Sequence, residues 1–423
     1  MESSQTNQSR VEPRPTAGLR GASWNADRIP ADMRTTVAAV VTEDGAQITG
    51  FLHARGKERS VIFIMHPREL LVTHYLVPHI VGAGYACWVQ GPRTVGNDLR
   101  LEHEVALLDV AAGMVHLRTL GFEKIVVLGN SGGASLFAFY NQQALLEPAR
   151  RITHTPGLRP VKLAEAALPA PDGFVFIAPH PGQGQLLLNC IDPSVKDESD
   201  PMSIDTALYP FSTVNGFEPK PQSSHYEAQF ISRYRAAQRE RVARIDAMAG
   251  QMISERQSAR AKAKVGGTPV DAMRGALNAI FQVWRTDADL RAFDLRLDPS
   301  ERRWGTVWGS DPIASNLGGV GFARVCTPES WLSTWSGLMT NASFAKCGNA
   351  IQQPALLIYY SGDNTVFPSD VKGIFDTIAT SDKQRHDIKG NHHGHALAAG
   401  EEFPQDIAGA KLKSWLLERF PAR

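Results

Sequence analysis

The sequence predicts an α/β protein in which helices pack against a largely parallel sheet. Strand-like apolar runs alternate with helical patterns from about residue 36 to 190, and again from about residue 350 onward. Between them the alternation gives way to a mostly helical pattern, which indicates an inserted cap. We therefore expect a disordered tail (1–20), a core in two parts (21–191 and 351–423) and a helical cap (192–350).

The bulk composition narrows the classes of partner. The chain has 423 residues and a formal net charge of +1, which argues against nucleic acid or an anionic membrane as a partner. No apolar run approaches the ~18 residues of a membrane span, and the N-terminus lacks the apolar segment of a signal peptide. We expect a cytoplasmic protein. The sequence does not fix the oligomeric state, and a homodimer is compatible with it. The four scattered cysteines are expected to be reduced core residues.

The order of predicted elements supports the α/β assignment. Glu43-Asp44-Gly45 separates two strand-like runs and predicts a hairpin. Asp98 precedes a long helical pattern and is expected to cap it. The last helix is amphipathic and follows the last strand-like run. The expected strands are 36–42, 47–53, 60–65, 85–90, 124–130, 173–178, 354–360 and 385–389, and the expected helices are 69–81, 99–120, a pattern after 133, 226–264 and 403–417.

The stretch Gly129-Asn130-Ser131-Gly132-Gly133 predicts a nucleophile elbow. A buried-type strand runs into Gly-x-Ser-x-Gly and a helical pattern follows at once. Ser131 would then take strained backbone angles, and the glycines on either side would let strand and helix approach closely. The Gly132 N–H, at the start of the helix, would point toward a developing oxyanion.

A serine nucleophile needs a base and an acid that orients the base. Asp363 follows an apolar strand, so it is expected on the same sheet edge as the elbow. A later loop, Gly390-Asn391-His392-His393-Gly394-His395, follows the next strand and supplies three candidate bases. The order Ser131, Asp363, His393 is that of one known arrangement of the catalytic triad.

These motifs resemble the α/β-hydrolase superfamily. The resemblance covers roughly residues 36–190 and 350–420, with a cap between the sixth and seventh strands, and identifies no subfamily. Family loops that read Gly-x-x-His, counted from Gly390, give His393 as the base, with His392 and His395 as alternatives. His66-Pro67-Arg68 resembles the His-Gly-x loop, which implies that the Arg68 N–H is the second oxyanion donor. Pro67 departs from the family's glycine there.

Other residues are candidates for the same site. His66, His180 and Asn130 are expected to line the substrate pocket, although a structural role is equally compatible with His180. Asp370 and Asp387 are the alternative acids. With His386 as the one further ligand nearby, the histidine run is not expected to bind a metal. Five tryptophans in the cap would form its core or an aromatic wall, and five arginines of the long helix would form a solvated face: Trp284, Trp304, Trp308, Trp331, Trp335, Arg233, Arg235, Arg239, Arg241 and Arg244.

The predicted activity is hydrolysis of a small-molecule ester or lactone through an acyl-enzyme. No cofactor is needed for this chemistry. The aromatic cap suggests a bulky or apolar substrate. The same triad also serves C–C bond hydrolases, amidases and acyltransferases, and a catalytically silent ligand-binding relative remains the non-enzymatic alternative.

Overall fold

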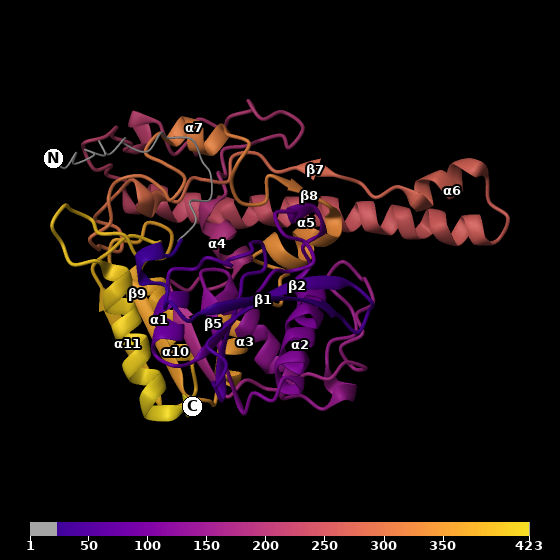
Figure 1. Cartoon of the computed structure of the whole chain (residues 1–423). Coiled ribbons are helices and arrows are strands. Elements are labelled where there is room, and N and C mark those ends of the chain that lie inside the picture. Colours follow the sequence, from indigo (N-terminus) through magenta and orange to yellow (C-terminus); the bar gives the residue numbers. More distant parts are fainter. Residues whose placement is uncertain (1–22, 423) are drawn as a thin grey trace, which may run out of the picture.

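An eight-stranded mixed sheet forms the centre of the molecule. The computed structural model describes residues 23–422, so the tail expected at 1–20 lies outside the described residues. The strand order is β1-β2-β4-β3-β5-β6-β9-β10. β2 is antiparallel to β1 and to β4, and the remaining neighbours are parallel (Figure 1). The strands are β1 (Arg34–Val41), β2 (Gln47–Ala54), β3 (Ser60–Met65), β4 (Ala86–Gln90), β5 (Lys124–Asn130), β6 (Gly173–Ile177), β9 (Ala355–Tyr360) and β10 (Lys383–Ile388).

Helices cover both faces of this sheet, and the strands alternate between the two cores. On one face α2 (His103–Thr119), α3 (Gly133–Ala144) and α10 (Pro368–Thr377) pack on residues such as Phe63 and Val127. On the other face α1 (Val77–Gly82) and α11 (Pro404–Arg419) pack on their strand neighbours, such as Ile64 and Val126. Both sets of strand residues are fully buried. This continuous apolar composition of the central strands is typical of a parallel sheet that is covered on both sides.

The predicted strands are confirmed, and two helix predictions need correction. The hairpin around Glu43-Asp44-Gly45 forms as expected, with Val41 opposite Gln47. The helix expected over 69–81 is restricted to α1, since Pro78 lies in its first turn and the chain before it forms turns. Asp98 does not cap α2. Its carboxylate instead accepts two hydrogen bonds from the Arg68 guanidinium, both of 2.7 Å.

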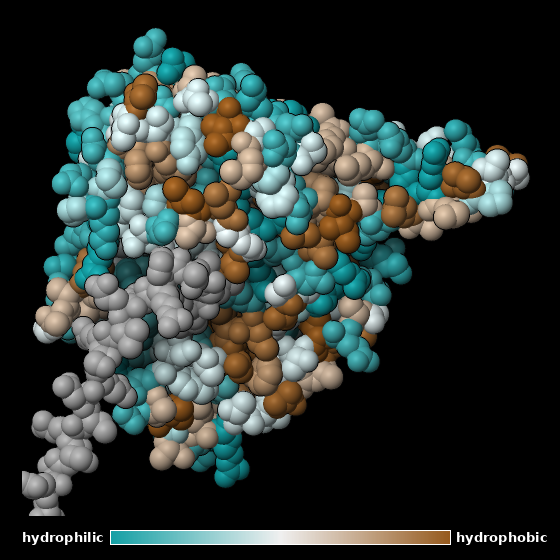
Figure 2. Space-filling model, turned by 90° about the horizontal axis from the view of Figure 1, so that it is seen from above, coloured by the Kyte–Doolittle hydropathy of each residue, from teal (hydrophilic) through white to brown (hydrophobic). Residues whose placement is uncertain are grey.

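The segment between β6 and β9 forms the insertion above the sheet. It begins with α4 (Gln183–Cys190) and contains the 37-residue helix α5 (Ala228–Lys264), which crosses the molecule and projects beyond it (Figure 1). α6 (Pro269–Ala276) packs back on the projecting end, where several apolar side chains are exposed (Figure 2). The remaining elements are short: β7 (Phe281–Gln282), α7 (Pro312–Leu317), β8 (Val325–Cys326), α8 (Pro328–Ser330) and α9 (Phe344–Cys347).

The side chains of the insertion form two apolar clusters. Trp331 and Trp335 pack with Val242 and Ile245 of α5 in one cluster, and Trp304 belongs to the other. All four cysteines are buried and unpaired, as predicted. Among residues 23–422, no helix has both the length and the apolar character needed to cross a membrane.

The solvated arginine face predicted for α5 is wrong at Arg241. This side chain is 1% exposed and ion-paired to Glu198. It also donates hydrogen bonds to the carbonyl oxygens of Asp192 and Trp284. Arg235, which is partly exposed, pairs with the buried Asp289. The helix is therefore fixed to the irregular part of the insertion by buried charge, which an all-apolar criterion for burial does not detect.

We expect Arg241→Met to lower the free energy of unfolding by about 1–3 kcal/mol, because it removes buried hydrogen bonds to Glu198 and to two carbonyl oxygens while Arg244 still pairs with Glu198. Arg239→Met is the matched control, since Arg239 is exposed on the same helix. Its effect should stay within about 0.5 kcal/mol. Denaturant unfolding followed by circular dichroism measures both. Equal stability of the two variants would contradict the structural role of Arg241.

Candidate active site

Ser131 lies on a strained turn at the carboxyl end of β5. Its φ is +54°, in the left-handed region that a side chain rarely adopts. Strand and helix approach so closely there that a methyl group on Gly133 would lie 2.4 Å from the Met65 carbonyl oxygen. A methyl group on Gly129 would lie 2.6 Å from the Ala134 backbone. The nucleophile elbow predicted from Gly-x-Ser-x-Gly is therefore present.

Three residues from distant parts of the chain converge at this turn. His392 Nδ1 lies 2.6 Å from Asp363 Oδ2, and His392 Nε2 lies 3.3 Å from Ser131 Oγ. Asp363 follows β9 and is fully buried, and its other carboxylate oxygen accepts hydrogen bonds from the backbone N–H groups of Thr365 and Val366. The acid is thus held rigidly while the imidazole bridges it to the serine.

The histidine predicted from Gly-x-x-His is wrong by one residue. The ring between Asp363 and Ser131 belongs to His392, whereas His393 lines the cavity beside it. The turn explains the shift: the Asn391 side-chain oxygen accepts hydrogen bonds from the N–H groups of His393 and His395. This tight turn directs His392 toward the sheet edge. The alternative acids lie elsewhere, with Asp370 paired to Arg291 and Asp387 to Arg385.

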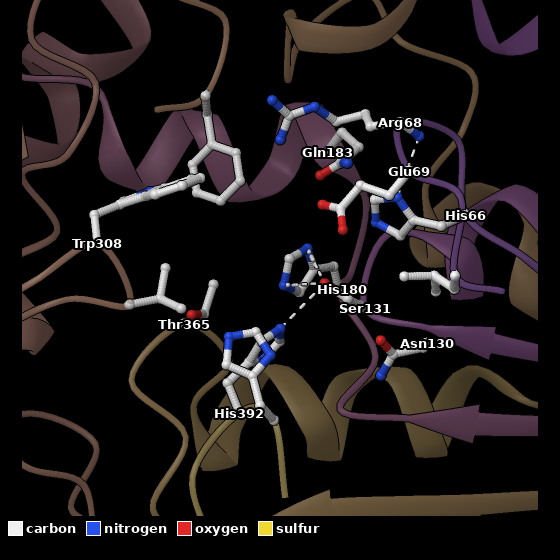
Figure 3. A pocket seen from close by; sticks show the side chains of 14 residues that line it. His66, Arg68, Glu69, Asn130, Ser131, His180, Gln183, Trp308, Thr365 and His392 are labelled. Carbon is white, nitrogen blue, oxygen red and sulfur yellow. Dashed lines mark hydrogen bonds between the residues drawn. The ribbon is translucent and has the colours of Figure 1, made fainter. Parts of the chain in front are cut away.

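A second imidazole also contacts the serine. His180 Nε2 lies 3.0 Å from Ser131 Oγ, closer than His392 Nε2 (Figure 3). The two rings stack with their centroids 5.4 Å apart. The backbone places His180 there. The His180 N–H donates to the Ser131 carbonyl oxygen, and the chain turns two residues earlier at Ala178, whose φ is +43°. The pocket position predicted for His180 is confirmed by this geometry.

Electrostatics distinguish the two imidazoles. Burial alone would lower the pKa of His392, but the charge and hydrogen bond of Asp363 outweigh it and raise that pKa above its usual 6.5. Burial, together with the charges of His392 and His66, lowers the pKa of His180 well below 6.5. His392 can therefore accept a proton near neutral pH, whereas His180 stays neutral and acts only as a hydrogen-bonding group.

The predicted oxyanion donors differ in their availability. Gly132 immediately precedes α3, and a methyl group on it would lie 3.0 Å from His66 Nε2. The Arg68 N–H instead donates to His66 Nδ1 at 3.2 Å, so the expectation that it points at the oxyanion needs correction. Burial and the adjacent Arg68 charge lower the pKa of His66 to about 3. A neutral ring that accepts at Nδ1 carries its proton on Nε2, beside Gly132.

The site opens into a small cavity of about 50 Å³. Asn130 lines it as predicted, and its side-chain amide donates to the Ile177 carbonyl oxygen. Glu69 and Gln183 also line it and were not singled out from the sequence, because neither belongs to a motif. Its fourteen lining residues are His66, Arg68, Glu69, Leu71, Asn130, Ser131, His180, Gln183, Val307, Trp308, Phe322, Thr365, His392 and His393. Within residues 23–422, no group of three His, Cys, Asp or Glu side chains is placed to bind a metal ion.

The strand order and the elbow together define the α/β-hydrolase fold. No protein-family model and no curated protein matches this chain. Three similar solved structures are the DcsB complex with a substrate analogue (13% identity, 91% of this chain and 100% of that chain, TM-score 0.49), an esterase of Pyrococcus furiosus (12%, 97% and 98%, 0.46) and the α/β hydrolase GrgF of Penicillium sp. sh18 (12%, 91% and 99%, 0.47). At these identities and TM-scores, the activity of this chain has to be argued from its own residues.

The histidines should titrate in separate pH ranges. We expect the ring-nitrogen resonances of His392 to change at a pH above 6.5, while His66 stays neutral down to about pH 4 because its pKa is about 3. Asp363→Asn should move the His392 titration below 6.5, since burial then acts without the opposing charge. NMR of protein labelled with ¹⁵N-histidine, assigned with single His→Gln variants, measures this. A His180 ring that protonates near neutrality would contradict the assignment.

Proposed function

We propose that this protein is a serine hydrolase that cleaves a carboxylic ester through an acyl-enzyme. The observation that carries the proposal is the His392 ring, which lies between the buried Asp363 carboxylate and the Ser131 hydroxyl on a strained elbow. An acid, a base and a nucleophile in this order within hydrogen-bond reach form the minimum set for nucleophilic acyl transfer.

In the proposed reaction the proton moves between two atoms. His392 Nε2 accepts the Ser131 hydroxyl proton as Oγ attacks the acyl carbon, and Asp363 stabilises the resulting imidazolium. The same proton then passes to the leaving oxygen as the ester bond breaks. A water molecule, deprotonated by His392, releases the acid and regenerates Ser131. His180 remains neutral and, as an N–H donor to Oγ, would orient the hydroxyl toward His392.

The oxyanion would be bound by Gly132 and His66. The Gly132 N–H lies at the start of α3, where the helix dipole also favours negative charge. The His66 Nε2–H replaces the backbone N–H that the family resemblance assigned to Arg68, because that N–H is bonded to His66 Nδ1. A neutral imidazole suits this role, since it donates a hydrogen bond without transferring its proton.

The cavity supports a small substrate over the bulky one suggested by the aromatic cap. Its volume is about 50 Å³, and the surface that its lining residues present is mostly apolar. Trp331 and Trp335 are buried in the core of the insertion, so Trp308 and Phe322 alone supply the aromatic wall. The same three side chains also serve amide cleavage, acyl transfer and C–C cleavage. Rates measured on a panel of substrates, rather than this geometry, distinguish these reactions from ester hydrolysis.

A small fluorophosphonate should form one covalent adduct, because an activated Ser131 attacks phosphorus as it would an acyl carbon. Intact-protein mass spectrometry should show the single adduct on the wild type and none on Ser131→Ala. Absence of an adduct on both proteins at high reagent concentration would overturn the proposal. An adduct on both proteins would place the reactive residue elsewhere.

The identity of the base can be tested with two neighbouring variants. His392→Gln should lower kcat/KM for a simple aryl ester by about a hundredfold or more, because the group that accepts the Ser131 proton is lost. His393→Gln should have a much smaller effect, since its ring does not bridge Asp363 and Ser131. Stopped-flow or steady-state release of the aryl alcohol measures both. A larger loss in His393→Gln would restore the base predicted from the sequence motif.

A further inference from the structure

One carboxylate in the cavity has no partner. Glu69 is the only acidic residue among the fourteen that line the cavity. Within the described residues its side chain makes neither an ion pair nor a hydrogen bond. Figure 3 shows its carboxylate pointing into the same space as the rings of His66 and His180. Burial raises the pKa of Glu69, although the nearby charges of Arg68 and His392 act in the opposite direction.

The neighbouring positive charge is used elsewhere. The Nε and Nη2 groups of Arg68 both donate to the Asp98 carboxylate, in a bidentate pair with distances of 2.7 Å. The same guanidinium lies over the rings of Trp335 and Phe322, at 5.0 and 5.7 Å from their centroids. His66 and His180 are neutral, because their pKa values lie far below 6.5. The nearby cations are Arg68 and His392, whose charges favour the ionised form of Glu69 without a hydrogen bond or ion pair to it among the described residues.

A second acceptor in the same cavity is also unsatisfied. The side chain of Gln183 is 1% exposed, and its Oε1 has no hydrogen-bond partner. Its Nε2 faces Gly132, at 2.6 Å from the position of an added methyl group, and the amide also interacts with the His180 ring. A buried acceptor left without a donor costs about 1–3 kcal/mol, so Gln183 Oε1, in the same cavity as the partly exposed Glu69 carboxylate, points to a ligand that supplies donors.

The wall of the cavity opposite Glu69 is aromatic. Trp308 and Phe322 line it, and Figure 3 shows Trp308 across the cavity from Glu69. The face of an aromatic ring attracts a cation, and a carboxylate attracts it from the other side. An ammonium group carries both the charge and three N–H donors, which matches a carboxylate and an amide oxygen better than a neutral hydroxyl would.

We propose that Glu69 and Gln183 bind a primary ammonium group of the substrate, so that the preferred substrates are esters whose acyl chain carries an ammonium group a few bonds from the scissile carbonyl. This inference rests on the proposed ester hydrolysis at Ser131. The cavity of about 50 Å³ contains both Ser131 and Glu69, which limits the ammonium group to within a few bonds of the reacting carbon. Glu69 thereby determines specificity and takes no proton in the reaction.

The test compares a matched pair of aryl esters, one of β-alanine and one of butyric acid, which differ in charge at similar length. The wild type should prefer the ammonium ester. In Glu69→Gln the ratio of the two kcat/KM values should fall by about 10- to 100-fold, the usual effect of removing a charged hydrogen-bond partner. Glu165→Gln is the control, since Glu165 is an exposed carboxylate outside the cavity. Active-site titration with the fluorophosphonate corrects each rate for folded enzyme.

Two further measurements separate the outcomes. Ethylammonium should compete with the butyrate ester in the wild type and should inhibit Glu69→Gln less strongly. A preference confined to choline esters would place the cation on the leaving-group side and would overturn the proposal. An unchanged ratio in Glu69→Gln would also overturn it. If Ser131 proves unreactive, ethylammonium binding to Ser131→Ala and to the Ser131→Ala/Glu69→Gln double variant, followed by calorimetry, still decides whether this subsite binds the cation.

Discussion

The strained backbone at Ser131 is the constraint on which the rest of the site depends. Its N–H donates to the Ile177 carbonyl oxygen, and its own carbonyl oxygen accepts from the His180 N–H. The elbow therefore joins the ends of β5 and β6 and fixes two side chains at once, the serine and His180. Such a conformation persists because glycines at 129 and 133 leave room for the strand and the helix to approach.

The sheet and the elbow could be predicted because their signals are local. Apolar runs specify the central strands, and Gly-x-Ser-x-Gly between a strand and a helix specifies the turn. The base was misassigned because three histidines within four residues differ only in how one turn directs them, and the Asn391 side chain sets that turn through hydrogen bonds. The oxyanion donor was misassigned for a similar reason, since the His66 ring bonds the Arg68 N–H.

Residues that act through tertiary placement were beyond the reach of the sequence. Glu69 and Gln183 come from segments more than a hundred positions apart and meet only where α4 begins above the sheet. Arg241 lies in a helix whose arginines suggest a solvated face, yet its partners come from loops that carry no periodic pattern. Polar groups of this kind are buried because each finds a specific partner, and a single sequence does not reveal those pairings.

The way the insertion is fastened to the core has a consequence for how ligands enter. The Ser333 hydroxyl donates to Glu104 and accepts from the His103 N–H, and Thr334 donates to the Leu101 carbonyl oxygen. All of these contacts are buried at the start of α2, so lifting the insertion as one body would break several hydrogen bonds together. The short turn between Gly305 and Gly309 carries Val307 and Trp308 into the cavity wall, and its hydrogen bond to the core runs from the Asn364 side chain to the Gly305 carbonyl oxygen. Exchanging this turn alone should therefore change which molecules are admitted while the fold of the insertion is retained.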